Sequence, residues 1–138
     1  YALIIFMIGL SASVNIYSEY NLQTTRRAFY QQEIDASAYI QSRTQPEEPI
    51  YVFGYRPSIF ILSDRDPPAN APVLGNFNIQ VKGPYENITI KILQEQQIRY
   101  IVHETMTKPE DAPVLFDYIQ KNYEAETTIG RFVIYRLK

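Results

Sequence analysis

The pattern of apolar and polar residues divides the chain into an uncharged beginning and a mixed remainder. Residues 1–18 carry no charge, and residues 2–10 are apolar apart from one glycine. Eighteen helical residues extend about 27 Å, just short of the hydrocarbon core of a bilayer. Residues 2–10 also lack the polar face of a surface helix. We therefore expect residues 1–18 to be the end of a transmembrane helix. A signal-peptide remnant and a buried core helix are the alternatives.

The middle of the chain predicts a helix, a strand, a second helix and a loop. Apolar residues recur at helical spacing over residues 19–44, and two prolines follow. The apolar run 50–54 ends at Gly54, which is typical of a buried strand. Residues 57–63 begin with Pro57 and predict a short helix. Residues 64–85 are rich in proline and predict a long loop.

The last third of the chain predicts two more helices and three strands. We expect a helix over residues 86–97, a strand over 99–103 and a helix over 113–123. Residues 124–129 and 132–137 flank Gly130 and predict a terminal hairpin. This order indicates a small α/β sandwich with a central, mostly parallel sheet, an antiparallel terminal strand and helices packed on it. Residues 19–138 would then form a single soluble α/β domain after the transmembrane end.

Composition excludes several kinds of site. A chain of 138 residues has room for one domain of ordinary size, and its formal net charge of −2 does not favour nucleic acid as a partner. The chain has no cysteine and only one histidine, which excludes disulfides, thiolate zinc sites and a multi-histidine metal centre. We therefore expect neither a metal nor a cofactor.

No established catalytic motif is present in the sequence. The glycine-rich dinucleotide fingerprint, the phosphate-binding P-loop and the nucleophile elbow are all missing. His103 closes the predicted strand 99–103 beside Glu104, which could pair with it or orient it. A structural or solvent-exposed role for His103 is the favoured interpretation. Asn87 and Thr89 complete an N-glycosylation sequon.

The densest polar cluster follows the second predicted helix. Asp64, Arg65 and Asp66 precede two prolines, a pattern that is typical of a turn. A binding site is the alternative, because Tyr55 and Arg56 end the preceding strand and the two segments could meet at that sheet edge. Arginine suits bidentate phosphate contacts, and Tyr55 could stack on a sugar. The candidate substrate-binding residues are Tyr55, Arg56, Asp64 and Arg65.

Three features together resemble a known family over nearly the whole chain. They are the apolar helix end that leads into a long polar helix, residues 48–68, and the ending over residues 100–135. These are similar to the extracytoplasmic C-terminal domain of polytopic GT-C type glycosyltransferases, in the protein mannosyltransferase and aminoarabinose transferase group. Residues 52–68 are the most specific part. Asp64 stands where glycine is commoner in that group, and Phe60 stands where tyrosine is common.

The resemblance implies a function for the parent protein rather than for this chain alone. Enzymes of this group move a sugar from a polyprenyl-phosphate donor to an acceptor on the outer side of the membrane. Their catalytic acidic residues lie in loops between upstream transmembrane helices, so no catalytic residue is assigned here. The implied partners are the upstream transmembrane domain, membrane lipid, and the donor or acceptor. A membrane-tethered ligand-binding or sensor module without an enzymatic parent is the alternative.

Overall fold

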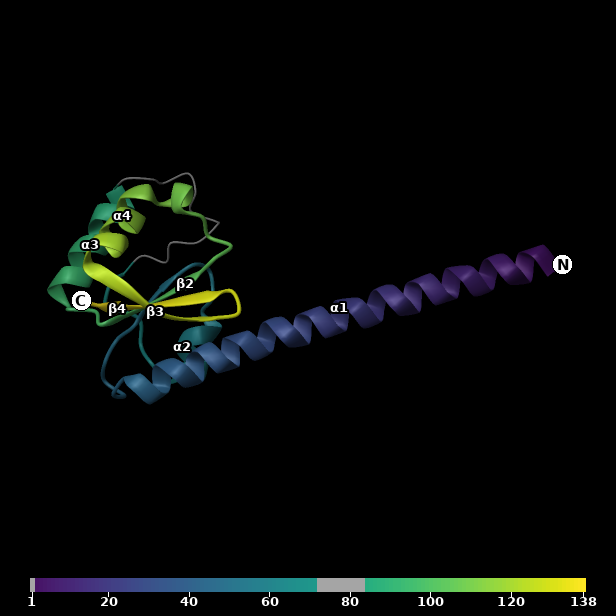
Figure 1. Cartoon of the computed structure of the whole chain (residues 1–138), viewed down its shortest axis with the longest axis horizontal. Coiled ribbons are helices and arrows are strands. Elements are labelled where there is room, and N and C mark those ends of the chain that lie inside the picture. Colours follow the sequence, from purple (N-terminus) through teal and green to yellow (C-terminus); the bar gives the residue numbers. More distant parts are fainter. Residues whose placement is uncertain (1, 72–83) are drawn as a thin grey trace. The chain divides into compact units, whose positions relative to one another are not determined.

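The computed structural model describes residues 2–71 and 84–138, with side chains from residue 23 onward. Its first element is α1 (Ala2–Arg43), a continuous helix. The chain divides into two compact units, Tyr1–Gln31 and Gln32–Lys138. The second unit contains the sheet, the remaining helices and the last turns of α1 (Figure 1).

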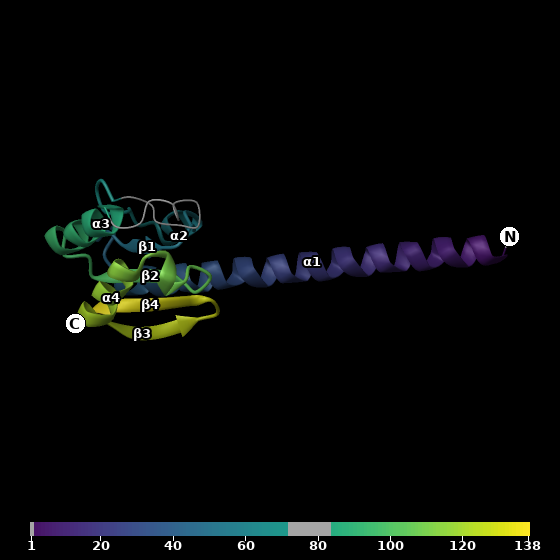
Figure 2. The same cartoon turned by 90° about the horizontal axis from the view of Figure 1, so that it is seen from above.

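The sheet has four strands in the order β1-β2-β4-β3, and Figure 2 shows these strands side by side in that order. The strands are β1 (Tyr51–Phe53), β2 (Tyr100–Glu104), β3 (Tyr123–Ile129) and β4 (Phe132–Leu137). β1 pairs with β2 in parallel, and the other two pairings are antiparallel. The sheet is therefore mixed, and the prediction of a mostly parallel sheet is wrong. The cause is that β4 inserts beside β2, so that the terminal hairpin supplies half of the strands.

Helices cover both faces of the sheet. One face packs against α3 (Pro84–Glu95) and α4 (Pro113–Asn122), and its core includes Leu93, Leu115 and Ile119. The other face packs against α2 (Ser58–Ser63) and the end of α1, through Ile59, Ala36 and Ile40. Strand residues alternate between the two cores as the pleat requires, so that both faces are buried and the fold is an α/β sandwich.

The predicted elements of the second unit are largely confirmed. The structure contains both helices predicted for its last third, both strands of the hairpin, and the strands near residues 51 and 101. Their ends are shifted by at most two residues. A short 3-10 helix η2 (Pro109–Asp111) precedes α4. Residues 64–71 are non-helical as predicted, residues 72–83 lie outside the described residues, and Pro84 and Tyr85 already belong to α3.

The prediction of a transmembrane end over residues 1–18 concerns side chains outside the described ones, although the backbone of residues 2–18 is helical. Among the residues that the structure does describe, no helix combines the length and the apolar character needed to cross a bilayer.

Candidate functional site

Four charged side chains meet where the parallel strands β1 and β2 end. Arg56 follows β1, and its Nε and Nη2 both lie 2.6 Å from Oε1 of Glu104 at the end of β2. Arg131, beside the turn of the hairpin, places Nη2 2.7 Å from Oε1 of Glu33 on α1. The two pairs are joined by contacts of 3.5 Å from Arg131 to Glu104 and 3.7 Å from Arg56 to Glu33. We call these four residues the Arg–Glu network.

Local backbone geometry brings the network together. Gly54 adopts φ +136°, and a Cβ there would lie 2.9 Å from the Cβ of Glu104. The absent side chain therefore lets the chain turn directly over the end of β2. Ser58 at the start of α2 donates to the second oxygen of Glu33 over 2.8 Å. Two arginines balance two glutamates, so this largely buried group carries no net charge and its carboxylates are paired.

Arg56 is the member of the network that reaches solvent. Its side chain is 30% exposed, whereas that of Glu104 is 4% exposed. Glu104 engages Nε and Nη2, and Nη1 has no hydrogen-bond partner among the residues that the structure describes. Tyr55 beside it is half exposed. The network thus holds an arginine with one outward-facing edge next to an exposed aromatic ring, an arrangement that could contact an oxyanion or a sugar.

Arg65 has a different environment, because the side chain is buried and its donors are fully used. Nε donates to Oγ1 of Thr44 over 2.8 Å. Nη2 donates to the carbonyls of Gln41 and Thr44 at the end of α1, and Nη1 donates to those of Ser63 and Asp64. These five bonds use all five guanidinium donors. Arg65 therefore caps the carbonyl end of α1, and a phosphate would have to displace these contacts to bind it.

The four predicted site residues consequently do not form one site. Arg56 contacts Glu33 on α1, and Arg65 contacts Thr44 directly after the end of α1, 11 positions further on. At 1.5 Å per residue Glu33 and Thr44 are about 16 Å apart along the helix axis. The intervening helix α2 carries the chain from the carboxyl end of β1 back towards its amino end, where Ile50 donates to the carbonyl of Asp66. The structure therefore places Arg56 at the carboxyl end of β1 and Asp66 beside its amino end.

Asp64 serves the backbone at the end of α2. It has φ +53° and ψ +49°, and its N–H donates to the helix carbonyls as a left-handed C-cap. Glycine adopts this conformation at no steric cost, and aspartate tolerates it better than most residues. This accounts physically for an aspartate at a position where glycine is commoner in the resembling group. The Asp64 carboxylate itself is exposed.

His103 is a core residue rather than part of a surface pair. Its ring is 5% exposed, stacks on Phe53 with 4.9 Å between centroids, and meets the edge of Phe116 at 5.5 Å. Nε2 carries the proton, because it lies 2.8 Å from the carbonyl oxygen of Thr107, which can only accept. Burial is the main cause that lowers the pKa of His103 below its ordinary value. Glu104 points to the opposite face of the sheet, so the predicted pairing with His103 does not form.

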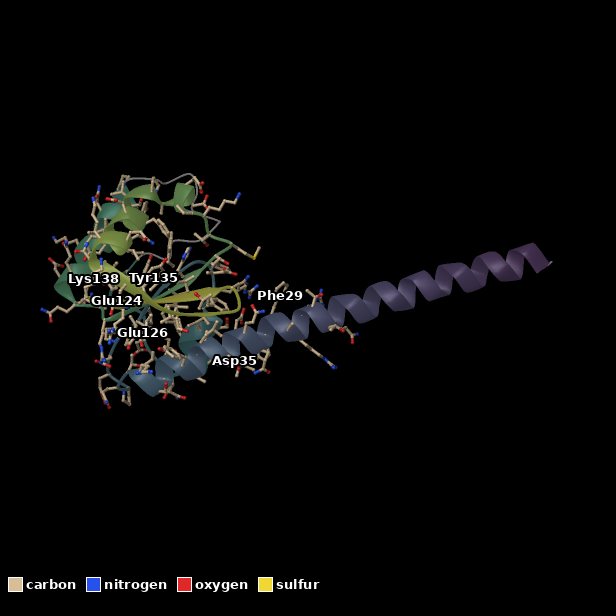
Figure 3. The ribbon with its side chains drawn as sticks, in the orientation of Figure 1. Phe29, Asp35, Glu124, Glu126, Tyr135 and Lys138 are labelled. Atoms are coloured by element: carbon tan, nitrogen blue, oxygen red, sulfur yellow. The ribbon has the colours of Figure 1, made fainter. Side chains whose placement is uncertain are left out.

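Two further polar features are structural. Glu126 on β3, labelled in Figure 3, accepts hydrogen bonds from Tyr39 over 2.6 Å and from Tyr100 over 3.3 Å. Hydrogen bonding to Glu126 raises the pKa of Tyr39. In the sequon, Asn87 is exposed on α3, whereas Thr89 is fully buried and its hydroxyl donates to the carbonyl of Tyr85.

Sequence reasoning found one member of the Arg–Glu network and missed three. Glu33, Glu104 and Arg131 are 27 to 98 positions apart, and no motif spacing joins them. One signal could have found Glu104. It directly follows a predicted strand, Arg56 follows another, and the carboxyl ends of neighbouring parallel strands lie side by side. Within the described part of the chain, no three His, Cys, Asp or Glu side chains are grouped so that they could hold a metal ion.

Comparison with known proteins gives no match: no family model, no curated protein and no solved structure is significantly similar to the chain.

The capping role of Arg65 predicts a large loss of stability on substitution. Arg65→Met leaves buried carbonyls without donors, and we expect the free energy of unfolding in urea to fall by at least about 3 kcal/mol. Arg99→Met is the control, because Arg99 is half exposed, forms a surface ion pair with Glu48 and lies 5.3 Å from the centroid of the Tyr100 ring. Its substitution should cost less than about 2 kcal/mol. Equal losses in both variants would contradict the capping role.

The burial of His103 predicts acid-sensitive stability. An unfolded histidine titrates near pH 6.5, and the folded pKa is lower, so the unfolded state binds more protons as the pH falls below that value. The stability of the folded state should therefore be full above about pH 6.5 and decline below it. His103→Phe keeps an aromatic ring and removes this titration. Urea unfolding from pH 7.5 to 5 should show a smaller decline for the variant, and identical declines would exclude His103 as the cause.

Proposed function

We propose that the chain is a non-catalytic extracytoplasmic domain of a membrane glycosyltransferase, one that transfers a sugar from a polyprenyl-phosphate donor to an acceptor. In this proposal residues 1–18 are the end of a transmembrane helix, and the domain lies on the outer side of the cell membrane. The upstream transmembrane domain of the same polypeptide, membrane lipid and the donor or acceptor are its partners. The catalytic acidic residues belong to that upstream domain.

The conformation of residues 52–68 is the observation that carries the proposal. This segment holds the most specific part of the resemblance, and it folds as a strand, a glycine at positive φ, a six-residue helix and a left-handed residue before a proline turn. Each of these features has the residue type that its geometry needs. Asp64 is also consistent with the resemblance. It stands where glycine is commoner in that group, and its backbone has the left-handed conformation that glycine adopts easily.

The continuity of α1 also supports the proposal. The uncharged residues 2–18 belong to the same helix as the residues that pack on the sheet, among them Ala36 and Ile40. Among the predicted site residues, Arg56 has an outward-facing edge and Tyr55 is half exposed, and we propose that a phosphate or a sugar contacts them there.

The proposal predicts a polytopic parent. The coding sequence upstream of Tyr1 should encode around ten hydrophobic spans, with an acidic residue or pair in the first outer loop, when it is scored with a 19-residue hydropathy window. A single span followed by this domain would overturn the glycosyltransferase parent. That result would favour a membrane-tethered binding or sensor module, to be screened for ligands.

Arg56 provides a functional test in the full-length enzyme. A charge-assisted hydrogen bond to phosphate is worth about 1.5–3 kcal/mol, so Arg56→Ala should lower the transfer rate at limiting donor by roughly ten- to a hundredfold. Arg56→Lys retains the charge, so its transfer rate should lie between those of Arg56→Ala and the wild type. Arg99→Ala, which removes an equally charged but remote residue, should have no effect. Normal transfer by Arg56→Ala in a folded protein would remove Arg56 from the proposed site.

A further inference from the structure

A groove lies outside α2, at the end of the domain away from the Arg–Glu network. It has a volume of about 420 Å³ and is lined by Pro46, Phe60, Ile61, Asp64, Asp66 and Pro67, with the buried Arg65 behind them. Ile61 is 80% exposed, the largest exposed fraction among the large apolar side chains of the described chain. Ile61 therefore adds exposed apolar surface to a groove whose other walls include prolines and an aromatic ring.

The charge of the groove is negative and unbalanced. Asp64 and Asp66 are exposed, and neither carboxylate has an ion-pair partner within residues 23–71 and 84–138. Arg65 lies behind them and donates only to neutral oxygens, so its positive charge offsets one of the two carboxylates and one net negative charge remains. Cations are therefore favoured in the groove and anions are repelled.

The shape and the chemistry together define the occupant. The groove is more open than enclosed, whereas small-molecule sites bury most of their ligand. Its apolar wall and its two carboxylates lie side by side, so that an occupant needs an apolar group and a cation in adjacent positions. An extended peptide with alternating apolar and basic side chains meets both requirements.

We infer that this groove docks a basic, partly apolar peptide segment, with a lysine or arginine side chain between Asp64 and Asp66 and an apolar side chain on Phe60 and Ile61. The site is independent of the proposed sugar transfer, and the partner is another protein segment, such as a loop of a neighbouring chain.

Fluorescence polarisation with the full 138-residue chain in a nonionic detergent tests this inference. The probe is a labelled octapeptide Gly-Ala-Leu-Lys-Leu-Arg-Ala-Gly, and the matched peptide carries Glu and Asp in place of Lys and Arg. We expect only the basic peptide to bind. The double variant Asp64→Asn with Asp66→Asn should weaken binding about fivefold or more. Asparagine tolerates the left-handed backbone at position 64, so the fold is expected to persist.

Matched controls separate docking from general charge attraction. Asp117→Asn removes one negative charge on α4, which packs on the other face of the sheet, and should leave binding unchanged. Ile61→Ser should weaken binding, whereas Ile88→Ser on α3 should not. Three results would overturn the inference: no binding at millimolar peptide, equal weakening by the control variants, or equally tight binding of butylammonium, which would identify a small amine as the occupant. A groove variant that loses peptide binding but keeps sugar transfer in the full-length enzyme would leave the proposed function standing.

Discussion

The last three turns of α1 hold the domain together, because they bring an apolar stripe and polar anchors to one face of the sheet. Ala36 and Ile40 enter the core beneath β1, β2 and β4. Polar contacts fix both ends of this stripe: Glu33 binds Arg131 at one end, and the carbonyls near Thr44 are capped by Arg65 at the other. Apolar packing supplies most of the stability, and the polar contacts fix the position of the helix along the sheet.

This arrangement decides what each arginine can do. Arg65 and Arg131 are mainly occupied with protein acceptors, the first at the end of α1 and the second within the Arg–Glu network. Arg56 lies at the rim of the network and keeps an outward-facing edge. A neutral, buried set of charges is costly to disturb, so a ligand would engage Arg56 at its exposed edge while the pair with Glu104 remains. Tyr55 and Arg56 thus belong to one surface, and the groove beside α2 belongs to another.

The elements were predictable where the local signal was strong. Prolines marked the end of α1 and the start of α2, Gly54 ended β1, and Gly130 separated the strands of the hairpin, each for a backbone reason that acts within a few residues. The order of strands was not predictable in the same way. Whether β4 lies beside β2 or at the outside depends on pairings between residues about 30 positions apart, which no local pattern specifies.

The sequence by itself determined the class of the fold, its helices and strands, the exclusion of cysteine chemistry, and the presence of arginines and aspartates around α2. Only the tertiary structure decided their roles. It brought Arg56 to Glu33 and Arg65 to Thr44, 11 positions further along the chain. It also placed Glu104 on the face opposite His103 and paired Glu33 with Arg131 across 98 positions. The reason is physical: propensity and capping act over one turn, whereas ion pairing and burial depend on which distant segments the packed sheet brings into contact.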